Sequence, residues 1–258
     1  MPNGPTVCAI MLTKDRPELA AKAVECFRKQ TYPVKALYLQ DFGVQRFDPG
    51  NVRDLRMCLA WDAPNGTIGS NRNAANKGAS GYQFRNQTSA PWLSPDIFIH
   101  WDDDDWSHPN RIAEQVAFLQ ASGADAVGFN EMLFWRTFTH IEDHYCEGGE
   151  CCAPQAWLYS HPRPDRPLGT SLCYWRKTWE RKPFADGPKP GMPSEFFHWF
   201  RELKVVAVSS LERGEPRMVA RIHGANFGTY DLEGLIAGGS REWKRVPDWD
   251  ERIRSILA

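Results

Sequence analysis

The sequence predicts an α/β fold built around a parallel sheet, and two observations support this prediction. An apolar run, an amphipathic segment and a second apolar run follow one another within about 35 residues, as in a strand–helix–strand unit. Acidic side chains come after these runs: Asp15 after the first, Asp41 after the second, and four consecutive aspartates after a later one. Because parallel sheets bind ligands at the carboxyl ends of their strands, we expect these side chains to share one crevice.

The first strand, helix and second strand are predicted from local patterns. Residues 7–12 form a continuous apolar run, which indicates a buried strand. Asp15 with Glu18 three residues later has the spacing of a capping box, and Pro17 falls in the first helical turn. Residues 36–39 form the second strand. The apolar stripe of the helix between them consists of Ala20, Ala23, Val24 and Phe27.

The middle of the chain alternates between helices and strands. Residues 69–81 are rich in Asn, Ala and Gly and predict a helix with a polar start, followed by a loop at 82–95. A further helix opens at Pro109, because apolar side chains recur after it at spacings of three and four residues. Residues 126–129 predict a short strand.

The last part of the chain begins with a long segment that has no periodic pattern. Residues 136–168 are rich in His, Cys, Pro and Gly and are expected to form a long functional loop. Residues 204–208 and 218–222 predict late strands. Residues 243–257 predict a terminal helix.

Charge and hydropathy argue against some classes of function. The formal net charge is -1, so no overall attraction to nucleic acid or to an anionic membrane is expected. No run approaches the roughly 20 apolar residues that a membrane span needs. Residues 1–5 lack a charged start followed by an apolar core, so we expect no signal peptide and a cytoplasmic location.

The seven cysteines, an odd number, argue against a fully paired disulfide framework. A group of His and Cys residues in the predicted long loop could bind zinc, although its spacing fits no common zinc finger. An acceptor loop that contains chance cysteines is the alternative. The group comprises His140, His144, Cys146, Cys151 and Cys152.

Four consecutive aspartates, residues 102–105, follow an apolar run and lie between two tryptophans. Four adjacent carboxylates repel one another, and a hard divalent cation is our first candidate for neutralising them. Since side chains alternate along a strand, Asp102 and Asp104 are expected to share one face. Mg²⁺ or Mn²⁺ suits these oxygens better than Zn²⁺, and a nucleotide diphosphate would complete the shell. The alternative is a solvated acidic loop that caps the helix at Pro109.

Five segments in a fixed order carry a resemblance to a known family. They are Leu-Thr-Lys-Asp-Arg-Pro-Glu at 12–18, Gln-Thr-Tyr-Pro at 30–33, Ser-Asn-Arg-Asn at 70–73, the aspartates with Pro109, and Gly-Thr-Ser-Leu-Cys-Tyr at 169–174. In this order they resemble the family 2 glycosyltransferases, with the aspartates matching the DXD element. The resemblance implies a GT-A (Rossmann-like) fold, a mixed, mostly parallel sheet flanked by helices in a single domain. Residues 1–105 would bind the nucleotide sugar, 106–230 the acceptor, and 231–258 would form a C-terminal helical tail.

The resemblance also implies roles in binding the donor. Thr13 and Asp15 would lie beside the base and ribose, Asp41 would contact the base, and Asp103 would face the ribose. Arg72 would approach the diphosphate, a role that suits the paired donors of a guanidinium. The alternative for Arg72 is a surface position on its helix.

The implied cofactor is Mn²⁺ or Mg²⁺, and the implied donor is a nucleotide-diphosphate sugar, here a UDP-sugar. Asp104 and Asp102 would hold the metal. His223, after a late strand, would approach the metal or the diphosphate, with a structural histidine as the alternative. Asp105 would steady the turn before Pro109.

Glu195 is the catalytic base that the resemblance implies, since it matches the first of two acids before a Trp-containing helix. Phe196 replaces the second acid, and Asp186 is a weaker candidate. Glu195 would take the proton from an acceptor hydroxyl during transfer with inversion. The alternative is that Glu195 caps its helix. The acceptor stays open between saccharide, lipid, protein and modified nucleic acid.

Three rival functions predict sequence features that can be compared with the chain. A nucleotidyltransferase would need a glycine-rich loop after the first strand, which the chain lacks. A two-metal phosphodiesterase or nuclease would need further ligands at other strand ends, where only His223 is a candidate. A catalytically inactive carbohydrate- or nucleotide-sugar-binding protein of the same fold remains the alternative, because of Phe196.

Overall fold

β1 (Val7–Thr13) lies between β2 (Lys35–Asp41) and β4 (Ile97–His100) and runs parallel to both. β3 (Met57–Trp61) adds to β2, also in parallel. α1 (Pro17–Arg28) joins β1 to β2, which confirms the predicted strand–helix–strand unit. This computed structural model describes residues 4–48, 57–61, 66–81, 95–137, 154–163, 165–185, 199–211, 214–223 and 241–258.

β6 (Ala126–Arg136) organises the second part of the sheet. It is antiparallel to β7 (Gln155–Ser160) and β8 (Cys173–Trp175), and parallel to β9 (Val205–Ser209) and β10 (Met218–Ile222). β8 also pairs with β4, so both parts belong to one mixed sheet, as the predicted α/β class requires. The two remaining strands are β5 (Trp106–Ser107), which pairs with β10, and β11 (Trp243–Arg245), which pairs with β7.

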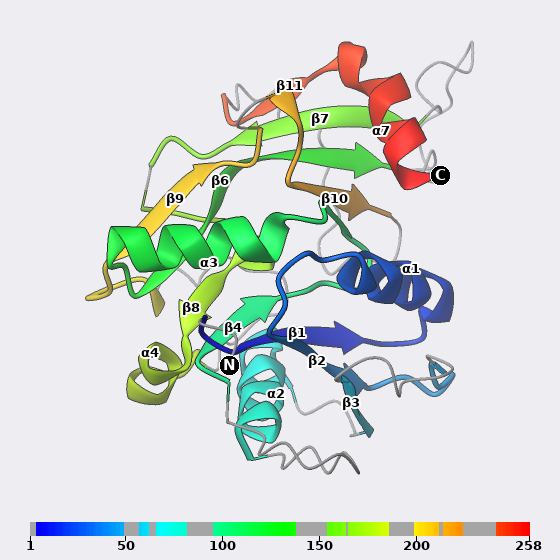
Figure 1. Ribbon diagram of the computed structural model, residues 1–258. Helices are drawn as coiled ribbons and strands as arrows, with labels where there is room; N and C mark the ends of the chain where they lie inside the picture. The colour runs from blue at the N-terminus through cyan, green and yellow to red at the C-terminus, as the bar shows by residue number, and fades with distance from the viewer. Residues whose placement is uncertain are drawn as a thin grey trace.

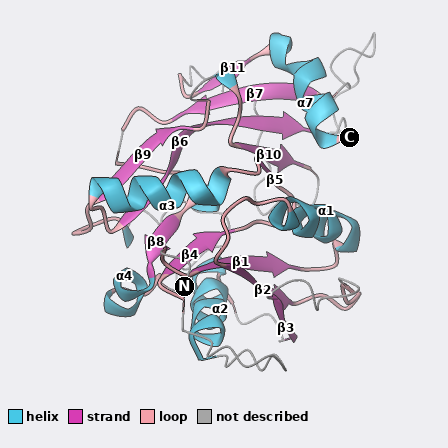
Figure 2. Cartoon of the chain, viewed as in Figure 1, coloured by secondary structure: helices cyan, strands magenta, loops and turns pink. Residues whose placement is uncertain are grey.

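Helices cover both faces of the parallel part of the sheet (Figures 1 and 2). Alternate side chains of β1 point to opposite faces. Val7, Ala9 and Met11 pack with α1 and α3 (Arg111–Ser122), whereas Cys8 and Ile10 pack with α2 (Ile68–Gly81). The short α4 (Arg176–Arg181) follows β8. Among the described residues, no helix is long and apolar enough to span a membrane.

Two predictions about the later strands are wrong. The segment predicted to be irregular, residues 136–168, contains β7, and the strand predicted at 126–129 continues to Arg136. The second half of β6 pairs with β7 along its whole length. Each of these segments is therefore stabilised by a distant partner that no local pattern reveals.

The C-terminal helix is shorter than predicted. The segment 243–257 begins with β11 and continues with a 3-10 helix at Pro247–Trp249 before α7 (Asp250–Leu257) starts. Pairing with β7 holds the first three residues extended. Val246 precedes a proline, which disfavours helical backbone there, so the strand and the helix are separated at this point.

α1 begins at Pro17, but the predicted capping box does not form. The residue at the N-cap is Arg16, and its side chain makes no capping hydrogen bond. Asp15 has a φ of 52° and accepts a hydrogen bond from the Gln45 amide at 2.8 Å. Asp15 therefore links the loop after β1 to the loop after β2 instead of capping the helix.

Gly78 allows α2 to pack closely on β2. A Cβ at this position would lie 2.2 Å from the Tyr38 hydroxyl oxygen and 2.6 Å from the ring carbon that carries it. Replacing a helical glycine with alanine normally stabilises a protein, but here we expect Gly78→Ala to destabilise it by about 1–3 kcal/mol through overpacking. Urea denaturation measures the change. Lys77→Ala, at an exposed position one residue earlier, should change stability by less than about 0.5 kcal/mol. A stabilised Gly78→Ala protein would contradict this packing.

Candidate functional site

The candidate site lies where β1 and β4 end side by side. The two strands are parallel and paired, with Ile10 opposite His100, so the residues that follow them meet at one edge of the sheet. Thr13 is the last residue of β1, and the aspartate run begins two residues after β4 ends. The predicted convergence of these segments is therefore confirmed.

The aspartate run lies in a turn beyond β4, and the four side chains have different partners. β4 ends at His100, and no strand geometry extends through the run. The expectation that Asp102 and Asp104 share one strand face is therefore wrong. Trp101 anchors the start of the turn, because its buried indole donates a hydrogen bond to the Ala23 carbonyl of α1 at 3.0 Å.

Asp103 is buried against the end of β1. The Thr13 hydroxyl donates to its Oδ2 at 2.6 Å, and Arg16 Nη2 lies 2.7 Å from its Oδ1. Burial, and next the charge of Asp104, raise the pKa of this carboxyl to about 7, although Arg16 and Thr13 act in the opposite direction. The structure thus places the predicted ligand residues Thr13 and Asp103 in direct contact.

Asp104 meets His223, which directly follows β10. Their Oδ2 and Nε2 atoms lie 3.0 Å apart. Arg16 Nη1 lies 3.0 Å from the same Oδ2 and 3.5 Å from the same Nε2. Two predicted metal ligands, far apart in the sequence, are therefore brought together around one guanidinium group.

Asp102 lies apart from this group and pairs with Arg72. Nη2 of this buried α2 arginine donates to Oδ1 of Asp102 at 2.8 Å. Burial by itself would raise the pKa of Asp102, but the charge and hydrogen bond of Arg72 outweigh it and lower the pKa. Asp102 therefore stays ionised and orients the Arg72 side chain, which is not a surface residue.

Asp105 faces the interior. Its oxygens accept hydrogen bonds from the Thr170 hydroxyl at 2.5 Å and from the Arg221 backbone amide at 3.1 Å. Burial, followed by the charges of Asp104 and Asp102, raises the pKa of this carboxyl well above its usual value. Asp105 thus fastens the turn to β10, in keeping with its predicted role in steadying the turn.

Arg111 stabilises the two ends of the turn from within the core. Its guanidinium is buried and donates to Ser107 Oγ at 2.9 Å, to Gln115 Oε1 at 3.1 Å, and to the carbonyls of His100 and Thr170 at 2.9 and 3.2 Å. Burial lowers the pKa of Arg111 to about 10, so this residue remains charged at neutral pH. It supplies positive charge next to the aspartates from within the core.

His100 links the end of β4 to α2 through side chains. Its Nδ1 lies 2.6 Å from the Gly169 carbonyl and its Nε2 lies 3.3 Å from the Tyr174 hydroxyl, which accepts a hydrogen bond from Asn76 at 2.8 Å. Burial, followed by the charge of Arg72, lowers the pKa of His100 well below its ordinary value. His100 is therefore neutral and structural.

The loops after β1 and β2 form the wall of the site beside Thr13. Asp41 is fully buried, and its two oxygens accept hydrogen bonds from the amides of Gly43 and Phe47, both at 2.8 Å. A Cβ on Gly43 would lie 2.6 Å from the Asp15 amide nitrogen, so this close approach requires glycine. Asp41 therefore shapes the loop, and its contact with a base stays a prediction.

The described side chains provide two of the ligand atoms that a divalent ion would need, but not a complete set. Among the described residues, no three His, Cys, Asp or Glu side chains are grouped as a complete metal site. Asp104 Oδ2 and His223 Nε2, at 3.0 Å, have the spacing of adjacent ligands in an octahedral shell with bonds of about 2.1 Å. This pair could hold an ion whose other ligands come from phosphates and water, whereas Asp102 is held by Arg72.

Two arginines at the site were not given a role from the sequence. Arg16 and Arg111 neutralise part of the acidic run, a function that the sequence led us to assign to a metal. The sequence does carry a signal for Arg16. This basic residue follows the predicted strand at 7–12, and a predicted parallel sheet would bring the end of that strand close to the aspartate run. Arg111 carries no such signal, because its position in a helix gives no indication that it is buried.

Several predicted residues lie outside the described part of the chain. These are the candidate bases Glu195 and Asp186 and the possible zinc ligands His140, His144, Cys146, Cys151 and Cys152. Their roles stay predictions.

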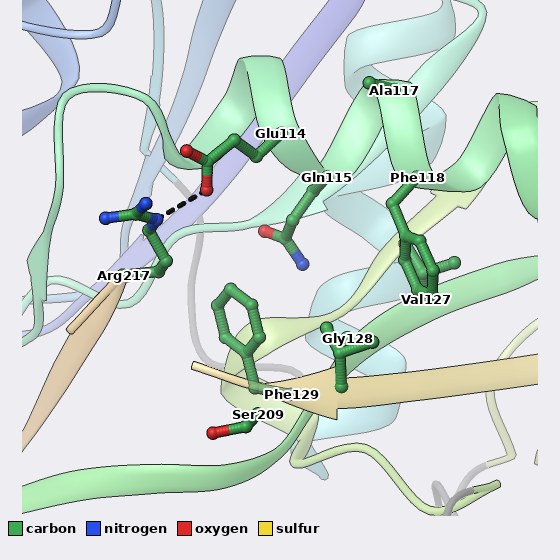
Figure 3. Close-up of a pocket in the computed structure, with 10 residues that line it drawn as sticks. Glu114, Gln115, Ala117, Phe118, Val127, Gly128, Phe129, Ser209 and Arg217 are labelled. Carbon is green, nitrogen blue, oxygen red and sulfur yellow. Dashed lines mark hydrogen bonds and ion pairs between the residues drawn. The ribbon is translucent and has the colours of Figure 1, made fainter. Parts of the chain in front are cut away.

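Two cavities of the described structure differ in how they relate to the site. One, of about 450 Å³, adjoins the site and is lined by Asp104, Asp105 and Trp106 together with residues of α1 and α7. The other, of about 280 Å³, lies under α3 and includes none of the predicted site residues (Figure 3). Glu114 and Arg217 form an ion pair at 2.5 Å on its rim.

The raised pKa of Asp103 predicts a pH-dependent stability. When the pKa of a carboxyl is higher in the folded than in the unfolded state, the free energy of unfolding falls as pH rises between the two pKa values. Without divalent cations, the free energy of unfolding of the wild-type protein should fall between pH 5.5 and pH 8 by on the order of 1 kcal/mol more than that of Asp103→Asn. Urea denaturation in EDTA measures this. Asp165→Asn, at a partly exposed residue paired with Arg163, should behave as wild type. Equal pH dependence of wild type and Asp103→Asn would contradict the prediction.

No protein-family model matches the chain, and no curated protein matches it. Solved structures do match. S. aureus TarS 1-349 in complex with UDP-GlcNAc has a TM-score of 0.56 and 13% identity, over 87% of this chain and 61% of that one. Mannosyltransferase PcManGT from Pyrobaculum calidifontis, in complex with GDP-Man and Mn²⁺, has a TM-score of 0.56 and 15% identity, over 99% of this chain and 69% of that one.

The chain spans less than two thirds of the TarS chains that it matches, and only 37% of the longer one. At these identities the likeness shows the fold alone. The chain therefore shares a mixed sheet flanked by helices with proteins captured in complex with nucleotide sugars, as expected for the fold class. Membership of family 2 stays a prediction.

Proposed function

We propose that the protein is a metal-dependent glycosyltransferase that moves a sugar from a nucleotide-diphosphate sugar to an acceptor hydroxyl, with inversion. One observation carries the proposal: Thr13, Asp103, Asp104 and His223 come together beside the ends of β1 and β4, and Arg72 pairs with Asp102 of the same turn. This is the edge at which parallel sheets bind ligands. The fold is shared with structures that contain UDP-GlcNAc and GDP-Man.

The donor would be held by groups that the fold orients in advance. Asp102 fixes the Arg72 guanidinium, which suits the diphosphate because it offers paired hydrogen bonds to phosphate oxygens. Thr13 and Asp103 would lie beside the nucleoside, with Asp15 and Asp41 shaping the loops next to it. Because these contacts exist before the ligand binds, little conformational entropy of the Arg72 side chain would be lost on binding.

Asp104 and His223 would hold the metal ion. A bound ion would offset the charge that develops on the departing diphosphate. Mg²⁺ takes oxygen ligands almost alone, so the imidazole in this pair leads us to choose Mn²⁺. A UDP-sugar is the proposed donor, as the sequence resemblance implies.

Glu195 is the proposed base for the acceptor hydroxyl. It would accept the hydroxyl proton while the oxygen forms a bond to the anomeric carbon and the bond to the diphosphate breaks. The proton would end on the Glu195 carboxylate and the electron pair of the broken bond on the diphosphate.

The first test is incubation with a panel of nucleotide sugars and Mn²⁺, with release of the free nucleotide as the measured quantity. Wild-type protein should hydrolyse one donor slowly even without an acceptor. Asp104→Ala should lower kcat/KM by at least about a hundredfold, because it removes a proposed metal ligand. Asp165→Ala, a residue paired with Arg163, should leave the rate unchanged. Full activity in Asp104→Ala would refute the assignment, whereas donor binding without turnover would favour an inactive binding protein.

The second test separates the two candidate bases once the donor is known. Glu195→Gln should abolish transfer to an acceptor while donor binding, measured by calorimetry, stays within about twofold, because a general base acts on the acceptor. Asp186→Asn should retain most activity. The reverse result would move the role to Asp186, and full transfer by both variants would exclude each residue as the base.

A further inference from the structure

The Arg16 guanidinium covers the two atoms that would bind the metal. Nη2 lies 2.7 Å from Asp103 Oδ1, and Nη1 lies 3.0 Å from Asp104 Oδ2. The same Nη1 lies 3.5 Å from Nε2 of His223. Both proposed ligand atoms therefore face one nitrogen of Arg16.

A guanidinium and a metal ion cannot use these ligand atoms together. Each carries positive charge, and Asp104 Oδ2 and His223 Nε2 lie only 3.0 Å apart. An ion within bonding distance of both atoms, on the side that Nη1 occupies, would overlap Nη1 and be repelled by it. Binding of an ion to this pair from that side thus requires Nη1 to leave.

The Arg16 side chain has a route out of this position. It is 22% exposed, whereas the side chains of Asp103 and Asp104 beneath it are 1% and 10% exposed. Its backbone is fixed, because the Arg16 carbonyl accepts a hydrogen bond from the Ala20 amide in the first turn of α1 at 3.0 Å. Displacement would therefore be a movement of the side chain alone, and Nη2 could keep its contact with Asp103.

We propose that Arg16 is an internal counter-ion that a divalent cation must displace from Asp104 and His223, so that Arg16 sets the cation affinity of the site. The proposal rests on the metal dependence in the proposed function. In the metal-free protein Arg16 supplies positive charge to Asp103 and Asp104.

The test is the Mn²⁺ affinity of the free protein, measured by electron paramagnetic resonance without any nucleotide. The Arg16→Met variant should bind Mn²⁺ with an affinity at least about tenfold higher than that of wild type, the factor expected when one competing charge-assisted contact is removed. Unchanged or weaker binding would overturn the proposal, as would the absence of Mn²⁺ binding in both proteins. Thermal unfolding of each variant shows that the proteins compared are folded.

Three control variants separate displacement from a general change in charge. Arg72→Met removes the same charge next to Asp102, so an equal gain there would overturn a specific role for Arg16. The double variant Arg16→Met/Asp104→Ala should lose the gain, and a gain that persists would place the ion elsewhere and overturn the proposal. Arg28→Met, at a residue of α1 paired with Glu25, should bind as wild type.

The binding experiment and the sugar-transfer experiment can fail independently. Tighter Mn²⁺ binding by Arg16→Met with no turnover of any nucleotide sugar would support the role of Arg16 and refute the proposed function. Mn²⁺-dependent turnover by wild type, with no increase in the Mn²⁺ affinity of Arg16→Met, would support the proposed function and refute the role of Arg16.

Discussion

Keeping four adjacent carboxylates within a folded core is the constraint on which the rest of the site depends. The fold meets it by giving each aspartate a partner from a different part of the chain. Asp102 meets Arg72 of α2, Asp103 meets Thr13 and Arg16 after β1, Asp104 meets His223 after β10, and Asp105 meets Thr170. Elements from both parts of the sheet are therefore joined at one turn. The same partners place the groups that a nucleotide diphosphate would need.

The electrostatic argument for a metal changes once these partners are known. Arg16 supplies positive charge to Asp103 and Asp104, Arg72 supplies it to Asp102, and Arg111 supplies it from within the core. Neutrality of the turn therefore does not depend on a bound ion. The case for a metal rests instead on the geometry of Asp104 and His223 and on chemistry at a departing diphosphate.

Local sequence patterns were sufficient to predict the elements that show a continuous apolar run or a distinct apolar stripe. Residues 218–222 match β10, and the first helix keeps its predicted buried stripe of Ala20, Ala23, Val24 and Phe27. β7 and β11 could not be predicted in this way, because each is held by pairing with a distant strand. The separate roles of Asp102, Asp103 and Asp104 arise in a turn beyond the end of β4, where the alternation of side chains along a strand no longer applies. The resemblance pointed to Arg72 and His223, whose roles stay predictions, whereas Arg16 was given no role from the sequence.

The bond between Asp105 and the backbone amide of Arg221 has an evolutionary consequence. It ties the acidic turn to β10, two residues before His223, through a main-chain group. The spacing of Asp104 and His223 therefore does not depend on which side chain occupies position 221. Sequence can drift along β10 while Asp104 Oδ2 and His223 Nε2, the proposed metal ligands, keep their spacing, provided that the acid at 105 and the strand persist. A geometry fixed by main-chain bonding in this way can outlast most of the sequence identity between distant proteins that share a fold.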